Sequence, residues 1–546
     1  MQKIFLFIGF LLTLNSANAQ KFEPSAPLDI PLILSGTFAE LRSNHFHGGI
    51  DIKTQGRSGL KVSAVADGYV SRISVSPYGY GNALYLRHPE GYTTVYGHLN
   101  AFYPELEQWI EYQLRDRSKN YGNLYPGANQ FPVSRGQLVA FSGNTGGSFG
   151  PHLHFEIRDT KTEEPVNPLE FGIKVQDNKK PDLKGLMWTD RDFEGYGSFT
   201  DGDTIEMNKT KGFDIFTTDQ QDGANNNNGV YLIEAKADGQ VFFTAHYNRI
   251  NFNTSRFINA HINYPIYSSQ RVRYTRLYEL ENNPLKITTT YPILNRSFEA
   301  SKGWISVAAD SIVEISVSIF DFQKNQRNLI FYLKGSPTLN DYSVSEGLDW
   351  RKDQNLVIGP IKIHIPSGAL YNTDAFNLYK KGDDTYVIGE AVVPLQKHMT
   401  IHWELDSLQQ NKEGWFVWEY DSRGKKSAIT GKRNGDVLQL TTRSTGSYQL
   451  DQDVKKPEVS LIKSVPAKRS NSTFMEIQVR AEDDKTGIDR YSARIDGSFA
   501  RIDFDYKKDL LKVIVPKELT EGNHNLRIVV IDGVGNTTTK EYIITL

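Results

Sequence analysis

The chain consists mainly of short segments in which hydrophobic and polar residues alternate, separated by turns that contain glycine. Between residues 60 and 98 Asp67-Gly68 and Glu90-Gly91 separate such segments, and glycine at these positions supplies the positive φ that tight hairpins need. A further alternating segment covers residues 133–141. The pattern predicts a mainly β protein whose first part is a β meander, with strands at 60–66, 69–75, 83–88 and 92–98.

One segment changes to a helical period. Leu106, Ile110 and Leu114 recur every four residues, and Pro104 stands near the start, where its missing N–H costs little. The spacing predicts one amphipathic helix over 103–118, inside an insert at 101–132 that ends in a loop rich in Tyr, Asn and Gly. The apolar stripe favours a helix docked on the core, and a lid over a site is the alternative.

The length of 546 residues exceeds a single core and predicts three or four domains. Beyond a first domain at 20–176, a weak repeat marks two domain starts, because Asp177-Asn178-Lys179-Lys180-Pro181 is echoed by Asp453-Val454-Lys455-Lys456-Pro457. A second echo follows each of them, at 320–325 and 531–536. We expect β-sandwich (Ig-like) modules at 177–337 and 453–546 and a further β module at 338–452, none with a catalytic constellation.

The Asn-rich stretch after Asp222-Gly223 is a candidate for calcium binding through oxygen ligands, although a solvated loop is the simpler interpretation.

The first residues are typical of a secretory signal. Lys3 precedes an apolar run at 4–14, and Ala17-Asn18-Ala19 provides a small-x-small cleavage site. We therefore expect a signal peptide at 1–19 and a mature chain from Gln20, since the apolar run is too short for a permanent transmembrane anchor.

Composition narrows the chemistry. The chain contains no cysteine, so a lipid anchor on cysteine, a disulfide framework and thiolate ligands are excluded, and a metal must be held by His, Asp or Glu. The formal net charge is -2 and no basic block occurs, which argues against nucleic acid as a partner.

Two histidine motifs carry the candidate chemistry. His47 and Asp51 are four residues apart and share a face in either a helix or a strand, and Gly48-Gly49 favours extended or turning backbone. His152 and His154 point to one side if their segment is a strand. Two nitrogen ligands and one carboxylate would leave a tetrahedral zinc ion one open position, the arrangement of a catalytic site.

In this order and spacing the motifs resemble the lysostaphin-type (LytM-like) zinc endopeptidases, over about residues 30 to 170. The residues that carry the resemblance are His47-x-x-x-Asp51, Val65-Ala66-Asp67-Gly68-Tyr69-Val70, Tyr78-Gly79-Tyr80-Gly81-Asn82, Tyr96-Gly97-His98-Leu99 and Gly150-Pro151-His152-Leu153-His154-Phe155-Glu156.

The resemblance implies an antiparallel β fold (a duplicated hybrid motif) with a groove over one zinc ion. It places the zinc ligands at His47, Asp51 and His154 and the two catalytic histidines at His98 and His152. His45, which shares a face with His47 in an extended segment, is the alternative ligand that the motif disfavours. The insert at 101–132 departs from the family pattern, which affects the expected shape of the groove.

The expected function is that of an exported, periplasmic or extracellular zinc metalloendopeptidase that hydrolyses peptide bonds in peptidoglycan stems or cross-links. The alternative is a non-catalytic LytM-like regulator or wall-binding scaffold, but such proteins are expected to lack one or more of the five site residues. A third interpretation is an adhesin with an incidental enzyme domain. The β modules are expected to be spacers or docking surfaces for a protein partner, and Asn44 or a neighbour is a candidate for blocking the open metal position.

Overall fold

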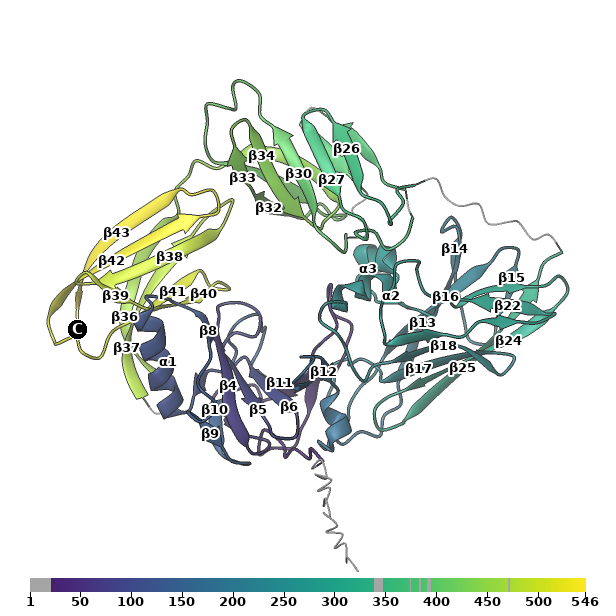
Figure 1. Ribbon diagram of the computed structural model, residues 1–546, viewed down its shortest axis with the longest axis horizontal. Helices are drawn as coiled ribbons and strands as arrows, with labels where there is room; N and C mark the ends of the chain where they lie inside the picture. Colours follow the sequence, from purple (N-terminus) through teal and green to yellow (C-terminus); the bar gives the residue numbers. More distant parts are fainter. Residues whose placement is uncertain (1–20, 338–346, 374, 383, 390–393, 470–471) are drawn as a thin grey trace, which may run out of the picture.

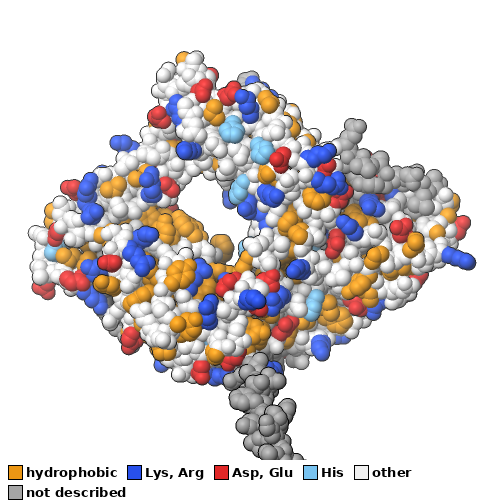
Figure 2. Space-filling model, in the orientation of Figure 1, with side chains coloured by type: hydrophobic (Ala, Val, Ile, Leu, Met, Phe, Trp, Pro, Cys, Tyr) orange, Lys and Arg blue, Asp and Glu red, His pale blue; other side chains and the backbone are white. Residues whose placement is uncertain are grey.

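The computed structural model describes residues 21–546 except 338–346, 374, 383, 390–393 and 470–471, so the expected signal peptide lies outside the described residues. The described chain is mainly β, as predicted, and its strands form four domains that we number in chain order. The domains are arranged as a ring (Figure 1), and the space-filling view shows an opening through the middle of it (Figure 2).

The first domain is built on a nine-stranded antiparallel sheet. Its main path runs β1-β2-β11-β6-β5-β4-β8, with β12 paired to β11 and β9 paired to β4. The strands are β1 (Leu34–Gly36), β2 (Ile50–Lys53), β4 (Gly68–Val75), β5 (Ala83–Arg87), β6 (Tyr92–Gly97), β8 (Gly122–Leu124), β9 (Pro132–Val133), β11 (His152–Asp159) and β12 (Pro165–Val166).

A smaller sheet and one helix complete this domain. The sheet has the order β3-β10-β7, formed by β3 (Lys61–Ser63), β10 (Leu138–Phe141) and β7 (Ala101–Phe102). The predicted helix is present as α1 (Pro104–Asp116), with Leu106, Ile110 and Leu114 buried in the core. The domain ends in a 3-10 helix, η1 (Pro168–Phe171).

The prediction of one strand over residues 133–141 was wrong. The segment divides into β9 and β10, because Gly136 adopts a left-handed φ of 81° and the N–H of Gln137 bonds to the carbonyl of Ser134. The turn sends the two halves into different sheets.

The second domain packs two sheets of seven and six strands. One has the order β14-β13-β16-β23-β22-β21 with β19 on β16, and the other β15-β25-β24-β17-β18-β20. The elements are β13 (Asp182–Asp190), β14 (Tyr196–Phe199), β15 (Thr204–Met207), β16 (Lys211–Thr218), β17 (Leu232–Ala237), β18 (Gln240–His246), η2 (Ser255–Phe257), α2 (Ile258–His261), α3 (Tyr264–Gln270), β19 (Thr275–Arg276), β20 (Thr288–Thr290), β21 (Ile293–Leu294), β22 (Phe298–Ser301), β23 (Trp304–Val307), β24 (Ile312–Phe320) and β25 (Gln326–Gly335).

The third domain has two five-stranded sheets, β26-β27-β30-β34-β33 and β28-β29-β35-β31-β32. Its strands are β26 (Gln354–Ile358), β27 (Ile361–Ile365), β28 (Leu378–Lys381), β29 (Thr385–Ile388), β30 (Met399–Glu404), β31 (Trp415–Tyr420), β32 (Lys426–Thr430), β33 (Lys432–Asn434), β34 (Val437–Thr442) and β35 (Gly446–Gln452).

The fourth domain has two four-stranded sheets, β36-β37-β41-β40 and β39-β38-β42-β43. Its strands are β36 (Glu458–Arg469), β37 (Ser472–Glu482), β38 (Ile488–Ile495), β39 (Ser498–Ala500), β40 (Ile502–Asp505), β41 (Leu510–Ile514), β42 (Asn523–Asp532) and β43 (Thr537–Thr545).

The hydrophobic cores divide the chain differently from the sheets. The first and second domains share one contiguous cluster of buried residues, which Tyr371 of the third domain joins, whereas the third and the fourth each have a cluster of their own. Burial of apolar surface is the main force that holds such elements together, so the first two domains form one packed body. None of the described helices is long and apolar enough to cross a membrane.

Contacts between the first and fourth domains close the ring. Nη2 of Arg501 lies 2.7 Å from Oε1 of Glu111 on α1, and the Arg501 side chain is only 2% exposed. Nζ of Lys507 donates to the carbonyl of Ser148 at 2.9 Å, in the loop that leads into β11. The first and the fourth domain are therefore joined by contacts of the charged side chains of Arg501 and Lys507.

Candidate metal centre

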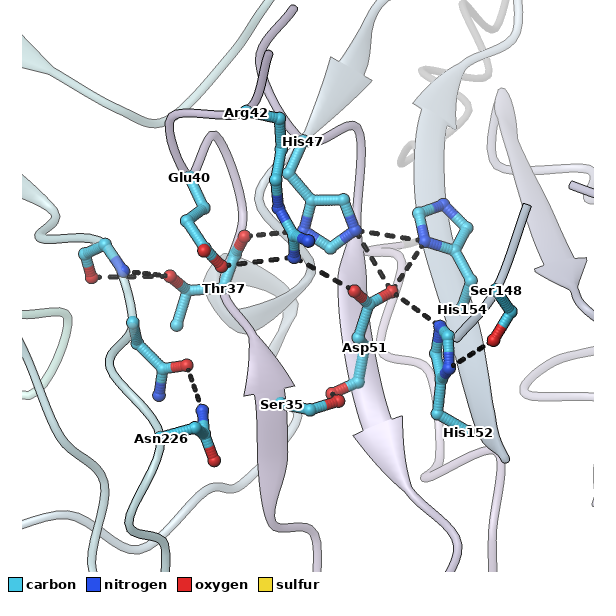
Figure 3. A network of polar contacts seen from close by, with 12 residues as sticks. Ser35, Thr37, Glu40, Arg42, His47, Asp51, Ser148, His152, His154 and Asn226 are labelled. Carbon is cyan, nitrogen blue, oxygen red and sulfur yellow. Dashed lines mark hydrogen bonds and ion pairs between the residues drawn. The ribbon is translucent and has the colours of Figure 1, made fainter. Parts of the chain in front are cut away.

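The centre is built on two neighbouring strands. β2 and β11 pair antiparallel with Asp51 opposite His154, and side chains directly opposite each other in such a pair lie on the same face of the sheet. His47 precedes β2 in a turn. Two backbone hydrogen bonds hold this turn: one is accepted by the carbonyl of His47, and the other runs from the N–H of His47 to the carbonyl of Glu40. The turn folds the imidazole of His47 back over Asp51 (Figure 3).

Glycines allow this close approach. A Cβ on Gly49 would lie 2.3 Å from the carbonyl oxygen of Phe155, which no side chain tolerates. Gly97 lies opposite His154 on the other neighbouring strand, and a Cβ there would lie 3.2 Å from the Cβ of His154. The glycines after His47 and before His98 are thus explained by packing of the backbone around the site.

Three possible ligand atoms form a compact triangle. Nε2 of His47 is 3.1 Å from Oδ1 of Asp51 and 3.1 Å from Nδ1 of His154, and Nδ1 of His154 is 2.9 Å from Oδ1 of Asp51. All three residues are buried, with exposed fractions of 3–8%. Figure 3 shows the three side chains pointing at one another.

Hydrogen bonds to residues outside the triangle fix which ring nitrogen of His47 and of His154 carries a proton. Nδ1 of His47 is 2.7 Å from the carbonyl oxygen of Thr37, and Nε2 of His154 is 2.7 Å from Oε1 of Glu156. Because these oxygens only accept, the outer nitrogens carry protons, and the inner nitrogens are the atoms that offer lone pairs to a metal once His154 has lost its second proton. Two lone pairs and a carboxylate converge on one point, so a positive charge is required between them.

A zinc ion fits this donor set. Zinc binds nitrogen and carboxylate oxygen at about 2.0–2.2 Å, and a tetrahedral arrangement then separates the ligand atoms by roughly 3.3–3.5 Å. The observed edges of 2.9–3.1 Å need to open by only a few tenths of an ångström. Oriented imidazoles whose second nitrogen bonds to a carbonyl or carboxylate are also the usual support of zinc ligands.

The electrostatics of the site favour a cation. Burial disfavours the charged form of His154, but the hydrogen bonds and charges of Asp51 and Glu156 outweigh it and raise the pKa of His154 to about 9. Burial likewise opposes ionisation of Asp51, yet the neighbouring histidines hold the pKa of its carboxyl well below the usual range. The pocket thus stabilises one positive charge between two carboxylates.

Glu156 is a site residue that the sequence analysis quoted in a motif without giving it a role. It is fully buried, and Tyr80 Oη donates to its Oε1 at 2.6 Å while Arg158 Nε donates to its Oε2 at 2.6 Å. Burial raises the pKa of Glu156, but Arg158 and His154 reverse this and lower the pKa to about 2. Its spacing of two from His154 on a strand was the signal that could have identified it.

Arg42 was also missed. Its Nη2 lies 3.1 Å from Oδ2 of Asp51, the carboxylate oxygen that is not part of the triangle. The ion pair orients Asp51 so that Oδ1 faces the two histidines (Figure 3). No short motif links Arg42 to Asp51, so the sequence alone gave no signal for it.

The other two predicted histidines lie beside the triangle. Nε2 of His152 is 3.4 Å from Oδ1 of Asp51, and its Nδ1 is 2.9 Å from the carbonyl oxygen of Gly150. The rings of His98 and His152 lie 4.7 Å apart between centroids. The structure therefore brings all five predicted site residues together.

His98 is held in a neutral form. Its backbone is left-handed, with φ of 58°, and its Nδ1 is 2.8 Å from the carbonyl oxygen of Thr145. Burial, together with the nearby His154 and His152, lowers the pKa of His98 to about 3. The imidazole therefore keeps a bare Nε2 at neutral pH, which can accept a proton.

The alternatives raised from the sequence lie outside the triangle. His45 is exposed, and its Nδ1 lies 2.8 Å from the carbonyl oxygen of Ser43. Asn44 accepts a hydrogen bond at its Oδ1 from Nδ2 of Asn259 at 3.0 Å. Neither side chain has a hydrogen bond to a triangle residue among the described contacts.

These features define a β domain with a centre suited to metal-dependent hydrolysis. Residues 45–112 and 121–168 match the family described as Peptidase family M23. The first domain belongs to this family, which confirms the resemblance drawn from the motifs. The gap in the match lies within the insert at 101–132. Residues 345–453 match a second family, described as the Zu5-like domain.

Relatives with assigned names match about a quarter of this chain. The DD-carboxypeptidase/endopeptidase Mpg of Neisseria meningitidis is 33% identical over 142 residues, which is 26% of each chain. The peptidoglycan DD-endopeptidase ShyA of Vibrio cholerae is 31% identical over 129 residues, 24% of each chain. This chain thus covers about a quarter of the length of these relatives.

A solved structure is also similar to part of this chain. The catalytic domain of lysostaphin from Staphylococcus simulans is 22% identical, with 26% of this chain and 91% of that chain covered and a TM-score of 0.20.

Proposed function

We propose that the protein is a zinc-dependent endopeptidase that hydrolyses peptide bonds in the stems or cross-links of peptidoglycan. The observation that carries the proposal is the triangle of His47, Asp51 and His154, whose lone pairs converge at distances suited to zinc. The substrate class is supported by the relatives, which are named as DD-carboxypeptidase/endopeptidase and peptidoglycan DD-endopeptidase.

His47, Asp51 and His154 would hold one zinc ion per chain, leaving one position open. Such an ion activates water and polarises a carbonyl group when it is bound. The remaining chemistry belongs to the side chains around it. Because His98 keeps a bare Nε2, it can accept a proton and later pass that proton to the leaving amine.

His152 is placed to share this work. It is the most exposed of the five residues, with 16% of its side chain accessible, and it lies between His98 and Asp51. Ser148 and the carbonyl of Gly150 contact its Nδ1 and fix the direction of the ring. One of the two histidines accepts the proton and the other hydrogen-bonds the developing oxyanion.

An enzyme that acts on peptidoglycan works in the cell envelope, and the signal peptide expected at 1–19 agrees with this location. We propose export to the periplasm or the cell exterior on these two grounds.

The test incubates the mature chain, residues 20–546, with purified sacculi of directly linked and bridged types, and identifies released muropeptides by mass spectrometry. We expect new products that disappear with a chelator. In His98→Ala and His152→Ala we expect the rate to fall roughly 10²- to 10⁴-fold while the zinc content stays at one per chain.

Controls separate ligands from the other histidines. His154→Ala should lose zinc as well as activity, whereas His45→Ala, two residues from His47 but exposed, should retain both. Equal zinc loss in His98→Ala would contradict the division of roles. A wild-type chain that binds no zinc and releases no product would instead support the non-catalytic scaffold.

A further inference from the structure

Two further groups of carboxylates lie outside the metal centre, one at the start of the second domain and one at the start of the fourth. The first consists of Asp177, Asp219 and Asp321, and the second of Asp453, Asp483 and Asp532. In each group one carboxylate oxygen from every residue lies within 4.8 Å of the others.

The first group contains a buried carboxylate oxygen without a hydrogen-bond partner. Asp219 is 5% exposed, and its Oδ1 is inaccessible and accepts no hydrogen bond. A cavity of about 30 Å³ borders Asp177 and Asp219, and the neighbours of Asp321, Phe322 and Gln323, line it as well. This volume is enough for a single ion or water molecule. An unpaired buried carboxylate oxygen is costly, so such an atom requires an explanation.

The second group repeats this arrangement in a separate part of the chain. Asp483 is partly buried and its Oδ2 accepts from three backbone N–H groups, but its Oδ1 is inaccessible and has no partner among the described residues. Asp453 and Asp532 are each only 1% exposed. The same kind of orphaned oxygen therefore occurs at both domain starts, in each case as the middle residue of its group.

One asparagine organises each group in the same way. Asn325 Nδ2 donates to the carbonyl of Asp177 at 3.3 Å and to Oδ2 of Asp321 at 2.7 Å. Asn536 Nδ2 donates to the carbonyl of Asp453 at 3.1 Å and to Oδ2 of Asp532 at 2.8 Å. In each repeat the asparagine thus holds the linker aspartate close to the aspartate at the end of a strand, which is β24 in the second domain and β42 in the fourth.

The charge of the first group is poorly compensated by protein. Burial and the charges of Asp177 and Asp321 raise the pKa of Asp219 to about 7, against smaller opposing effects from the backbone of Gln220 and from Lys179. Burial also raises the pKa of Asp177 and of Asp321. Three carboxylates that resist ionisation together are stabilised by a cation among them.

The donor atoms select the class of cation. Both groups offer carboxylate oxygens and no imidazole or thiolate, and hard divalent ions prefer oxygen ligands. Calcium accepts irregular sets of carboxylate, carbonyl and water ligands, whereas magnesium demands a nearly ideal octahedron. We propose that each aspartate group binds one calcium ion, at sites separate from the zinc centre.

Both sites lie at joints of the ring. Asp177 belongs to the linker between η1 and β13, and Asp453 to the linker between β35 and β36 (Figure 1). Each linker aspartate is brought together with two aspartates of the domain that follows it. A bound ion would therefore fasten the linker to the domain that follows it.

The test measures calcium binding by calorimetry with CaCl₂ on the zinc-loaded full chain, after removal of calcium on a chelating resin and confirmation that zinc remains. We expect two calcium ions per chain, with dissociation constants of about 10⁻³ M or tighter. Asp219→Asn and Asp483→Asn should each lose one site or weaken it by roughly tenfold or more, and the double variant should lose both.

Matched controls are Asp182→Asn and Asp489→Asn, which remove exposed aspartates of the same two domains and should retain both sites. A second measurement needs no variant: calcium should raise the unfolding temperature of the zinc-loaded wild type more than the same concentration of magnesium. Absence of both binding and this shift at about 10 mM calcium, or equal loss of binding in the controls, would overturn the proposal. None of these measurements depends on peptidoglycan hydrolysis.

Discussion

Oε1 of Glu156 lies 2.7 Å from Nε2 of His154, and the carboxylate is completely buried beneath the triangle. The contact fixes which nitrogen of His154 faces Asp51, and so it prepares the ligand before any metal arrives. Glu156 is in this sense a positioning residue for the proposed zinc site.

Glu156→Gln tests this relationship. The amide keeps the shape of the side chain but removes the charge that supports His154, so we expect zinc affinity to fall roughly 10- to 100-fold. Competition with a zinc-binding dye measures the change. Glu163→Gln is the control, because the Glu163 carboxylate is exposed and lies 3.6 Å from Nη1 of Arg158, and it should leave the affinity unaltered. Unchanged affinity in Glu156→Gln would show that Asp51 and the carbonyl of Thr37 suffice to orient the site.

Gly49→Ala should disturb the pairing of β2 with β11. The added methyl would collide with the carbonyl of Phe155, a backbone atom that moves only with its strand, and we expect a loss of about 1–3 kcal/mol in the free energy of unfolding. Gly127→Ala is the control, since a Cβ there meets nothing within 4 Å, and it should change stability by no more than about 0.5 kcal/mol. Urea unfolding of the two variants provides the comparison, and similar stabilities would argue against close packing at Gly49.

The contact between Arg501 and Glu111 should control closure of the ring. Because the chain has no cysteine, one introduced in the first domain and one in the fourth can carry a fluorophore pair whose energy transfer reports closure. Glu111→Gln and Arg501→Met should each raise the open fraction, with a coupling energy of roughly 0.5–3 kcal/mol in the double-mutant cycle.

The surface pair of Arg115 with Glu518 serves as the control for ring closure. Both side chains are largely exposed, and such pairs contribute about 0–1 kcal/mol, so Glu518→Gln should have little effect. An open fraction that rises equally in Glu518→Gln would remove the special role of the buried pair.

The raised pKa of Asp219 predicts a dependence on pH in calcium-free protein. The folded chain holds this proton more tightly than the unfolded chain, so its contribution to stability is complete below the unfolded pKa of 3.8 and is lost as pH rises through about 7. Relative to Asp219→Asn, the wild type should lose stability across this range. The protection factors of the Asp219 and Asn228 amides, which bond to each other's carbonyls, measure it locally by hydrogen exchange. Calcium should abolish the difference at pH 7, and a flat difference without calcium would contradict the prediction.

The sequence predicted those parts of the fold that depend on residues close to one another in the chain. The spacing of His152 and His154 matched a strand, and the stripe of Leu106, Ile110 and Leu114 matched the buried face of α1. Both predictions follow from the period with which side chains return to the same face of a strand or a helix, and a few residues are enough to reveal it. The turn at Gly136 escaped prediction because the alternation continues across it, and only the backbone conformation separates β9 from β10.

Other features depend on residues that are distant in the chain. Thr37 and Arg42 support the triangle through contacts that no motif spacing defines, and Arg501 meets Glu111 across 390 positions. The shared core of the first and second domains is equally non-local. Such contacts depend on how complete sheets pack, which the alternation of residues within one strand does not specify.

The contacts that close the ring join residues that are synthesised at different times. Roughly 330 residues separate the end of the family match from Arg501, and their synthesis takes on the order of 20–70 s. Single β domains fold within about milliseconds to seconds, so we expect the first two domains, whose shared core lacks only Tyr371 at residue 337, to fold long before Arg501 emerges. During synthesis the loop that carries Ser148 precedes Lys507, so we expect closure of the ring to follow folding of the first two domains.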